Sequence, residues 1–186
     1  MTDATAAVIA LGSNLGDREA TIRLACAAID ALDGVRLIAA SGLVESHALK
    51  PLGIDATAPN YLNAVALVQS GLTAGTLLNH LHEIEALGGR RRAERWGDRT
   101  LDLDLITFGE LSQVDGTLTL PHPRAWQRPF VLVPWLQIEP DATLVGYGRV
   151  DELEAAHSEQ VWEFAAPALF IAAALGAPQT IGSRHG

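Results

Sequence analysis

The sequence predicts an α+β sandwich, in which helices pack against a mainly antiparallel β-sheet. Three observations support this fold class. The chain has 186 residues with 48% apolar and 19% charged side chains, which suits one folded unit with a sizeable core. Strand and helix patterns alternate along it, without the long crossovers that a doubly wound parallel sheet requires. No internal repeat and no low-complexity linker divides the chain.

The first predicted elements are a buried strand and an amphipathic helix. Ala6–Leu11 is apolar and ends at a Gly-Ser-Asn turn. Arg18–Leu32 carries apolar residues at helical spacing, with Asp17 placed to cap its N-terminus. Val35–Val44 has strand character. Two prolines and a glycine then predict a long loop over residues 47–60.

A second strand–helix pair follows. Tyr61–Val68 is predicted to be a strand, and its period of two places Tyr61 and Asn63 on one face. Leu77–Leu87 is predicted to be a helix, capped by Thr73 and closed by a pair of glycines.

The remaining predicted elements are shorter. Leu101–Phe108 is a strand, and Leu118–Leu120 is expected to pair with it across a glycine-bounded turn. Pro129–Leu136 is either a short apolar helix or a strand, interrupted by an internal proline. The alanine-rich run Ala165–Ala177 is either a docked helix or a frayed tail.

Composition excludes several kinds of protein. The net charge of −9 argues against non-specific binding to nucleic acid or to an anionic membrane. The single cysteine, Cys26, rules out an internal disulfide and a cysteine-based zinc site. The N-terminus lacks the pattern of a signal peptide, and the weakly polar stretch Phe164–Ala177 is shorter than the ~20 residues of a membrane span. We therefore expect a cytoplasmic, soluble protein. We also expect a monomer with small-molecule partners, although composition does not decide the oligomeric state.

The strongest chemical signal is a pair of acids on one predicted strand. On that strand Asp102 and Asp104 project from the same face, about 6.6 Å apart, and the leucines that alternate with them fill the opposite, buried face. Adjacent carboxylates repel each other unless a cation lies between them. An all-oxygen pair with room for water and phosphate suits Mg²⁺. The alternative is a solvated strand face that carries two ordinary acids.

A cluster of arginines comes directly before these acids. Its five members fall within ten residues: Arg90, Arg91, Arg92, Arg95 and Arg99. Acids that hold a metal beside arginines that neutralise phosphate are what a magnesium–nucleotide complex requires. The alternative is a solvated basic loop paired with nearby glutamates. The sequence lacks a P-loop, a protein-kinase motif set and a nucleophile with an adjacent base, so any nucleotide site must use another architecture.

Three weaker signals are compatible with a binding site. The ring of Tyr61 and the amide of Asn63 suit a flat heterocycle, although a half-buried tyrosine beside a satisfied amide is the commoner explanation. His82 and Glu85 lie one helical turn apart and form either an exposed pair or the polar part of a nucleotide pocket. His122 lies between two prolines, a setting in which histidine is more often structural.

Together these residues resemble the 6-hydroxymethyl-7,8-dihydropterin pyrophosphokinase family. The resemblance covers residues 8–145, and six matching blocks run in the family's order: Ala10–Asp17, Pro51–Gly53, Tyr61–Ala64, Gly89–Arg92, Arg95–Asp104 and Leu120–Arg124. Arg128 and Phe130 follow these blocks and also match. The resemblance implies a ferredoxin-like α+β fold. It also implies a diphosphokinase domain over residues 1–150, followed by a C-terminal extension of unknown role over residues 151–186.

The resemblance implies an activity as well. Enzymes of this family transfer diphosphate from ATP to the hydroxymethyl group of 6-hydroxymethyl-7,8-dihydropterin and release AMP, a step of folate synthesis. Asp102 and Asp104 would hold two Mg²⁺ ions, and Arg90 and Arg92 would complete the catalytic set. Two alternatives remain: a non-catalytic pterin- or nucleotide-binding relative, and a generic interaction module whose acids and arginines form surface ion pairs.

Binding residues are carried over in the same way. The pterin site would consist of Leu52, Gly53, Tyr61, Asn63 and Phe130. The ATP site would consist of His82, Glu85, Arg90, Arg92, Trp96, Arg99, Leu105, Thr119, His122 and Arg128. The chain differs from the family pattern at three places: Asp98 stands where proline is usual, His82 where glutamine is common, and residues 45–50 form a longer loop.

Overall fold

A six-stranded sheet is the centre of the fold. The computed structural model describes residues 4–50, 53–55, 58–88, 100–157 and 161–170. The main path through the sheet is β12–β3–β6–β1–β7, and β2 also pairs with β6. All of these pairings are antiparallel. The strands are β1 Thr5–Ser13, β2 Val35–Ala40, β3 Leu43–Ser46, β6 Tyr61–Ser70, β7 Asp102–Phe108 and β12 Val161–Phe164.

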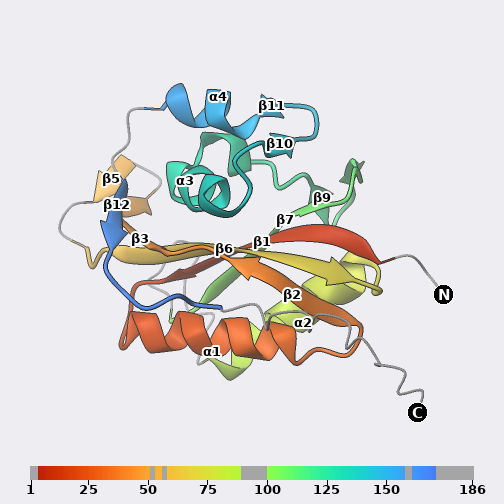
Figure 1. Ribbon diagram of the computed structural model, residues 1–186, viewed down its shortest axis with the longest axis horizontal. Coiled ribbons are helices and arrows are strands. Elements are labelled where there is room, and N and C mark those ends of the chain that lie inside the picture. The colour runs from red at the N-terminus through yellow and green to blue at the C-terminus, as the bar shows by residue number, and fades with distance from the viewer. Residues whose placement is uncertain (1–3, 51–52, 56–57, 89–99, 158–160, 171–186) are drawn as a thin grey trace, which may run out of the picture.

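Helices cover both faces of this sheet, which confirms the predicted α+β class. Figure 1 shows α1 (Arg18–Asp30) and α2 (Ala74–Leu87) on one face, and α3 (Pro129–Ile138) and α4 (Val150–Ala155) on the other. A short 3₁₀ helix, Ala125–Gln127, comes just before α3. None of the helices in the described residues is long and apolar enough to cross a membrane.

Local signals explain where α1 and α2 begin. The Asp17 carboxylate accepts a hydrogen bond from the backbone N–H of Ala20 at 3.0 Å, and the Thr73 hydroxyl accepts one from Thr76 at 3.2 Å. Each side chain satisfies a backbone donor that the first helical turn leaves unpaired. Gly88 closes α2 by donating its N–H to the Ile84 carbonyl at 2.9 Å. These caps were all predicted.

Two hydrophobic cores lie on the two sides of the sheet. The first packs α1 and α2 against the leucines of β7, and includes Ile9, Ile22 and Leu103. The second packs α3 and α4 against the other face, and includes Val65 and Trp135. Because strand residues alternate between the faces, each strand of the centre contributes to both cores.

Several predicted elements need correction. The single strand predicted over 35–44 is two strands, β2 and β3. They are separated at Ser41, whose hydroxyl accepts a hydrogen bond from the Val65 N–H at 2.9 Å. The loop predicted over 47–60 contains an antiparallel hairpin of β4 (Ala48–Lys50) and β5 (Gly53–Asp55). Gly53, one of the residues from which the loop was predicted, is itself the first residue of β5.

Two further corrections concern the second half of the chain. The expected partner of β7 instead forms β9 (Thr119–Leu120), which pairs with β8 (Gln113–Val114). α3 continues through Pro134, the residue expected to interrupt it. The lost backbone hydrogen bond is outweighed because Leu132 and Trp135 are buried in the second core.

The C-terminal part of the chain also returns to the sheet. A small hairpin of β10 (Thr143–Leu144) and β11 (Gly148–Arg149) leads into α4, which packs on α3. β12, which the sequence did not predict, then pairs with β3 and extends the sheet. Residues 165–170 are not helical, and the rest of the alanine-rich run lies outside the described residues.

Candidate active site

The register of three strands brings a predicted pterin-binding residue, Asn63, near the predicted metal ligands Asp102 and Asp104. Gly12 on β1 is the register partner of Asn63 on β6 and of Asp102 on β7. Two residues earlier, Ala10 lies opposite Asp104 on β7. Residues aligned in this way point to one face of the sheet. It is the face that carries α3, because Val65, two residues after Asn63 on β6, packs in the second core with α3. Asn63 and Asp102 are therefore two strand spacings apart, about 10 Å.

Gly12 forms the floor between these groups. A Cβ at this position would lie 3.4 Å from Asn63 Oδ1, 3.8 Å from Tyr61 Cδ1 and 3.9 Å from Asp102 Cβ. Glycine leaves that space to a ligand, since it has no side chain. In the sequence Gly12 is only one member of a matching block. Its position between the two halves of the site depends on strand register, which the sequence alone did not show.

The amide of Asn63 is held in one orientation. Asn63 is 5% exposed, and its Nδ2 donates a hydrogen bond to the Ser46 hydroxyl at 3.0 Å. The amide oxygen therefore lies toward Gly12, where a ligand's donor can reach it. Tyr61, two residues earlier on the same face, is half-buried. Ser46 shapes the site in this way, although no pattern in the sequence indicated it.

Arg128 links the start of α3 to the second acid. Its guanidinium donates a hydrogen bond to Asp104 Oδ2 at 3.0 Å and lies 5.7 Å from the centre of the Phe130 ring. Both side chains of this ion pair are half-buried, so solvent screens the pair less than an exposed one. The contact places a predicted ATP-site residue, a predicted metal ligand and a predicted pterin-site ring next to one another.

His122 is the second group beside Asp104. Its Nε2 is 3.7 Å from Asp104 Oδ2, and its Nδ1 accepts a hydrogen bond from the Arg124 N–H at 3.2 Å. In the neutral ring the proton is therefore on Nε2, the nitrogen nearer the acid. Burial lowers the pKa of His122 from its usual value. Asp104 opposes this shift and Arg128 reinforces it.

The start of β7 is anchored from two sides. The Ser13 hydroxyl donates to the Thr100 carbonyl at 2.6 Å, just before the strand begins. Farther along, Glu85 on α2 accepts a hydrogen bond from the Leu103 N–H at 2.8 Å. Asp102 and Asp104, on either side of Leu103, are both half-buried and share the face opposite the first core.

The predicted ATP residues are divided between two sides of the sheet. His122 and Arg128 contact Asp104, whereas His82 and Glu85 lie on α2, which covers the opposite face (Figure 1). In the described part of the chain β7 is the last strand of the sheet on this side. A single ligand that contacts both groups must therefore cross the edge of β7.

The other predicted residues can be placed more briefly. The Leu105 side chain is buried in the first core, so it does not face the acids. Thr119 is half-buried on β9, and Gly53 lies in β5. Outside the described residues lie Leu52, Arg90, Arg92, Trp96, Asp98 and Arg99.

The donor set fits Mg²⁺ with substrate as a further ligand. Within the described ranges, no group of three or more histidine, cysteine, aspartate or glutamate residues is arranged to hold a metal. Asp102 and Asp104 would therefore supply two carboxylates, and the other positions would be filled by water and phosphate oxygens. This arrangement is common for Mg²⁺, which retains water and binds through few carboxylates.

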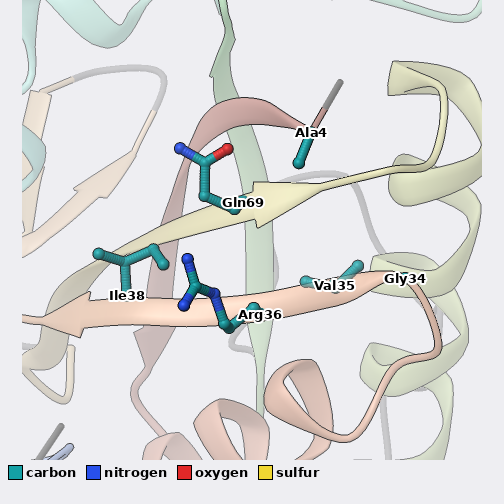
Figure 2. A pocket seen from close by; sticks show the side chains of 6 residues that line it. All are labelled: Ala4, Gly34, Val35, Arg36, Ile38 and Gln69. Carbon is teal, nitrogen blue, oxygen red and sulfur yellow. The ribbon is translucent and has the colours of Figure 1, made fainter. Parts of the chain in front are cut away.

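Two hollows formed by described residues lie away from these side chains. One, of ≈ 510 Å³, is lined by residues at the far end of β6 and the start of β2, including Arg36, Ile38 and Gln69 (Figure 2). Gln69 lies six residues beyond Asn63 on the same strand. No predicted site residue lines this hollow. The predicted site residues Asn63, Asp102 and Asp104 lie instead on the face of the sheet beside the start of α3.

Fold and site together define an α+β protein whose sheet carries a pair of aspartates two strands away from a buried, oriented amide. A family model described as 7,8-dihydro-6-hydroxymethylpterin-pyrophosphokinase matches residues 8–140. The chain belongs to this family.

Curated relatives support this assignment. A protein from Haemophilus influenzae is 40% identical over 147 residues, which cover 79% of this chain and 89% of the relative. One from Pseudomonas aeruginosa is 40% identical over 148 residues, with 80% and 89% covered. Both are named 2-amino-4-hydroxy-6-hydroxymethyldihydropteridine pyrophosphokinase.

Solved structures share the fold. Plasmodium falciparum HPPK-DHPS, wild type with pterin and p-hydroxybenzoate, has a TM-score of 0.63 at 14% identity, covering 83% of this chain. An HPPK-DHPS in complex with substrates has a TM-score of 0.61 at 12% identity, covering 82% of this chain. This chain spans 43% of each of those chains. The likeness confirms the ferredoxin-like fold expected from the sequence.

Proposed function

We propose that this chain transfers the diphosphate of ATP to the hydroxymethyl group of 6-hydroxymethyl-7,8-dihydropterin and releases AMP, a step of folate synthesis. Family membership supports the reaction class. The observation that carries the proposal is the alignment of Asn63, Gly12 and Asp102 across three strands. This alignment supports the proposal because the Asn63 amide, which we propose reads the heterocycle, lies about 10 Å from Asp102, which we propose as a metal ligand.

The pterin would occupy the space above Gly12. The Asn63 amide, oriented by Ser46, would hydrogen-bond the edge of the ring, and the rings of Tyr61 and Phe130 would stack on its faces. Such contacts fix the hydroxymethyl group relative to the acids. Holding two reactants in a productive geometry supplies much of the catalysis in phosphoryl transfer.

Asp102 and Asp104 would hold a pair of Mg²⁺ ions together with the ATP phosphates. When bound, these ions supply charge neutralisation for the phosphates and for the leaving group. Arg128 keeps the Asp104 carboxylate in place, and His122 presents an N–H to the same region. Arg90, Arg92 and Arg99 would bind phosphate oxygens.

The reaction needs no covalent intermediate with the protein. The pterin hydroxyl oxygen forms a bond to the β-phosphorus, and the bond from that phosphorus to the α–β bridging oxygen breaks. AMP leaves with that bridging oxygen, and the hydroxyl proton is released to water. The adenosine would extend across the edge of β7 toward Glu85 and His82, with Trp96 and the backbone around Leu105 and Thr119 nearby. We also propose that the protein is a cytoplasmic monomer.

The test measures products and metal dependence together. The wild-type protein is incubated with ATP, MgCl₂ and 6-hydroxymethyl-7,8-dihydropterin, and the products are monitored by ³¹P NMR. AMP and pterin diphosphate should form in equal amounts. Asp102→Asn should lower kcat by about 10²-fold or more because a metal ligand is lost. Asp33→Asn, at an exposed position after α1, should match wild type.

Other results would favour the alternatives. Binding of pterin and a magnesium–ATP analogue without AMP formation would identify a non-catalytic relative. A protein that binds neither ligand would be an interaction module, and the proposed function would be wrong.

A further inference from the structure

The last strand of the sheet lies beyond the part of the chain that matches the family model. That match ends at residue 140, whereas β12 covers Val161–Phe164. β12 pairs with β3 along its whole length, with Val161 opposite Ser46 and Trp162 opposite Glu45. β3 thus has β6 on one side and β12 on the other, so its position depends on both (Figure 1).

Trp162 makes the specific side-chain contact of this strand. Its ring meets the ring of His47 edge to face, with 4.9 Å between the ring centres and an angle of 77° between the planes. This is a favoured geometry for aromatic pairs. His47 is the residue between β3 and β4, at the point where the chain leaves the sheet for the β4–β5 hairpin.

His47 also links the two ends of segment 47–60, which connects β3 to β6. Its Nδ1 is 3.0 Å from Asn60 Oδ1, and Asn60 is the last residue before β6. Arg18 on α1 donates to the Asn60 carbonyl at 2.8 Å and to the Glu45 carboxylate at 2.7 Å. The ends of segment 47–60 are therefore closed by a connected set of contacts, and Trp162 packs on one member of that set.

The same region sets the geometry of the candidate pterin pocket. Ser46, immediately before His47, accepts the hydrogen bond that orients Asn63. Tyr61, immediately after Asn60, is the first residue of β6 and is paired with Ser46. A displacement of the end of β3 would thus move both the Asn63 amide and the start of the strand that carries Tyr61.

We propose that β12 is a positioning element for the pterin pocket, and that Trp162 acts through His47 to hold the ends of segment 47–60 in place. This inference rests on the proposed function for the identity of the ligand. Trp162 itself contacts neither the acids nor Asn63 through any described interaction, so its effect is on pterin affinity and not on the chemical step.

The experiment first compares wild type, Trp162→Ala, Trp162→Phe and Glu163→Ala, each as the whole chain. Titration calorimetry measures the dissociation constant of 6-hydroxymethylpterin in the presence of Mg²⁺ and a non-hydrolysable ATP analogue, and that of the analogue alone. Hydrogen exchange measures backbone protection of residues 43–47 and 60–63. Glu163 is the matched control, because it is exposed on the same strand and neighbours Trp162.

Trp162→Ala should raise the pterin dissociation constant about 3- to 10-fold, leave that of the ATP analogue within about 2-fold, and speed exchange at both ends of segment 47–60. Trp162→Phe keeps a ring against His47 and should restore most of the affinity, whereas Glu163→Ala should match wild type. A His47→Ala variant approaches the contact from the other side. The double variant His47→Ala/Trp162→Ala should lose less affinity than the two single losses combined.

The outcomes separate this proposal from the function on which it rests. If wild type binds pterin and Trp162→Ala binds it equally well, β12 does not position the pocket and the proposed function stands. Equal weakening of pterin and ATP analogue would also overturn the proposal, since it would indicate general destabilisation. If wild type binds no pterin, the proposed function fails as well. Should Trp162→Ala not fold, His47→Ala decides the question, and unchanged pterin affinity in that variant would overturn the proposal.

Discussion

Glu85 and Leu103 are joined by a hydrogen bond that connects α2 to the strand carrying both acids. The carboxylate Oε1 accepts from the Leu103 N–H at 2.8 Å, and Glu85 is only 1% exposed. Leu103 lies between Asp102 and Asp104, so this bond holds the backbone from which both project. Resemblance places Glu85 at the ATP site, and the structure gives it this positioning contact as well.

Removal of this carboxylate should destabilise the fold. Glu85→Ala leaves the Leu103 N–H without that acceptor, and should lower the free energy of unfolding by about 1–3 kcal/mol. Glu85→Gln keeps an oxygen acceptor and should lose less. Urea unfolding followed by circular dichroism measures both. Glu83→Ala, on the exposed side of α2, is the control; a Glu85→Ala variant as stable as that control would show that the bond contributes nothing.

The two aromatic rings should affect one substrate and not the other. Tyr61→Ala and Phe130→Ala each remove a proposed stacking face, so the pterin dissociation constant should rise by about 10-fold. Binding of a magnesium–ATP analogue should change little. Calorimetry with each ligand makes the comparison, and Tyr147→Ala, an exposed ring that stacks on Trp126, is the control. Equal weakening of both ligands would mean that the rings serve only the core.

A methyl group at position 12 should weaken pterin binding more than it destabilises the fold. In Gly12→Ala the new Cβ lies 3.4 Å from Asn63 Oδ1, which the fold can accept with little movement. It nevertheless fills the floor of the pocket, so pterin affinity should fall by about 10-fold, and Gly12→Val should lose more. Thermal unfolding checks the fold and calorimetry the affinity. Gly75→Ala meets no atom within 4 Å and is the control. Unchanged pterin binding in both Gly12 variants would place the ligand elsewhere.

Cys26 should make stability depend on alkaline pH. Burial raises the pKa of this thiol from 9.0 to about 11, an effect that Arg23 partly opposes. Below pH 9 the thiol is protonated in both the folded and unfolded states, so it adds no pH dependence. Between about pH 9 and 11 the unfolded chain loses the proton first. The free energy of unfolding should therefore fall as pH rises, by up to about 2.7 kcal/mol.

Cys26→Ala isolates this contribution from the other groups that titrate at high pH. Urea unfolding at pH 8, 10 and 11 should show wild type losing stability relative to the variant across that range. Parallel pH profiles for the two proteins would contradict the shift.

Patterns local to one segment were predictable. The alternation of leucine and aspartate in β7 correctly assigned the acids to the face opposite the core, and Asp17 and Thr73 identified the helix starts from their type and position. β12 was not predictable, because a four-residue segment with exposed positions becomes a strand only through the pairing offered by β3. Glu85 was also unexpected as a buried group, since an acid on a helix is ordinarily solvated.

The alignment of Gly12 with Asn63 and Asp102 could not be predicted from the sequence either. Asn63 and Asp102 could be assigned to faces of their own strands, but nothing local indicates that Gly12 aligns with both. That alignment is set by long-range pairing of β1 with β6 and β7. The hairpin of β4 and β5 was mistaken for a loop for a different reason: each strand has only three residues, too few to show an alternating pattern.

The alignment across β6, β1 and β7 has a consequence for how the chain can change in length. Deletion of one residue inside β1 would turn Leu11 toward the acids and Gly12 toward the core, because successive strand residues point to opposite faces. Side-chain repacking could not restore the alignment of Gly12 with Asn63 and Asp102. An added residue in the turn between β8 and β9, by contrast, moves nothing in these three strands. Natural insertions and deletions should therefore collect in the connecting segments, while the three strands keep a constant residue count.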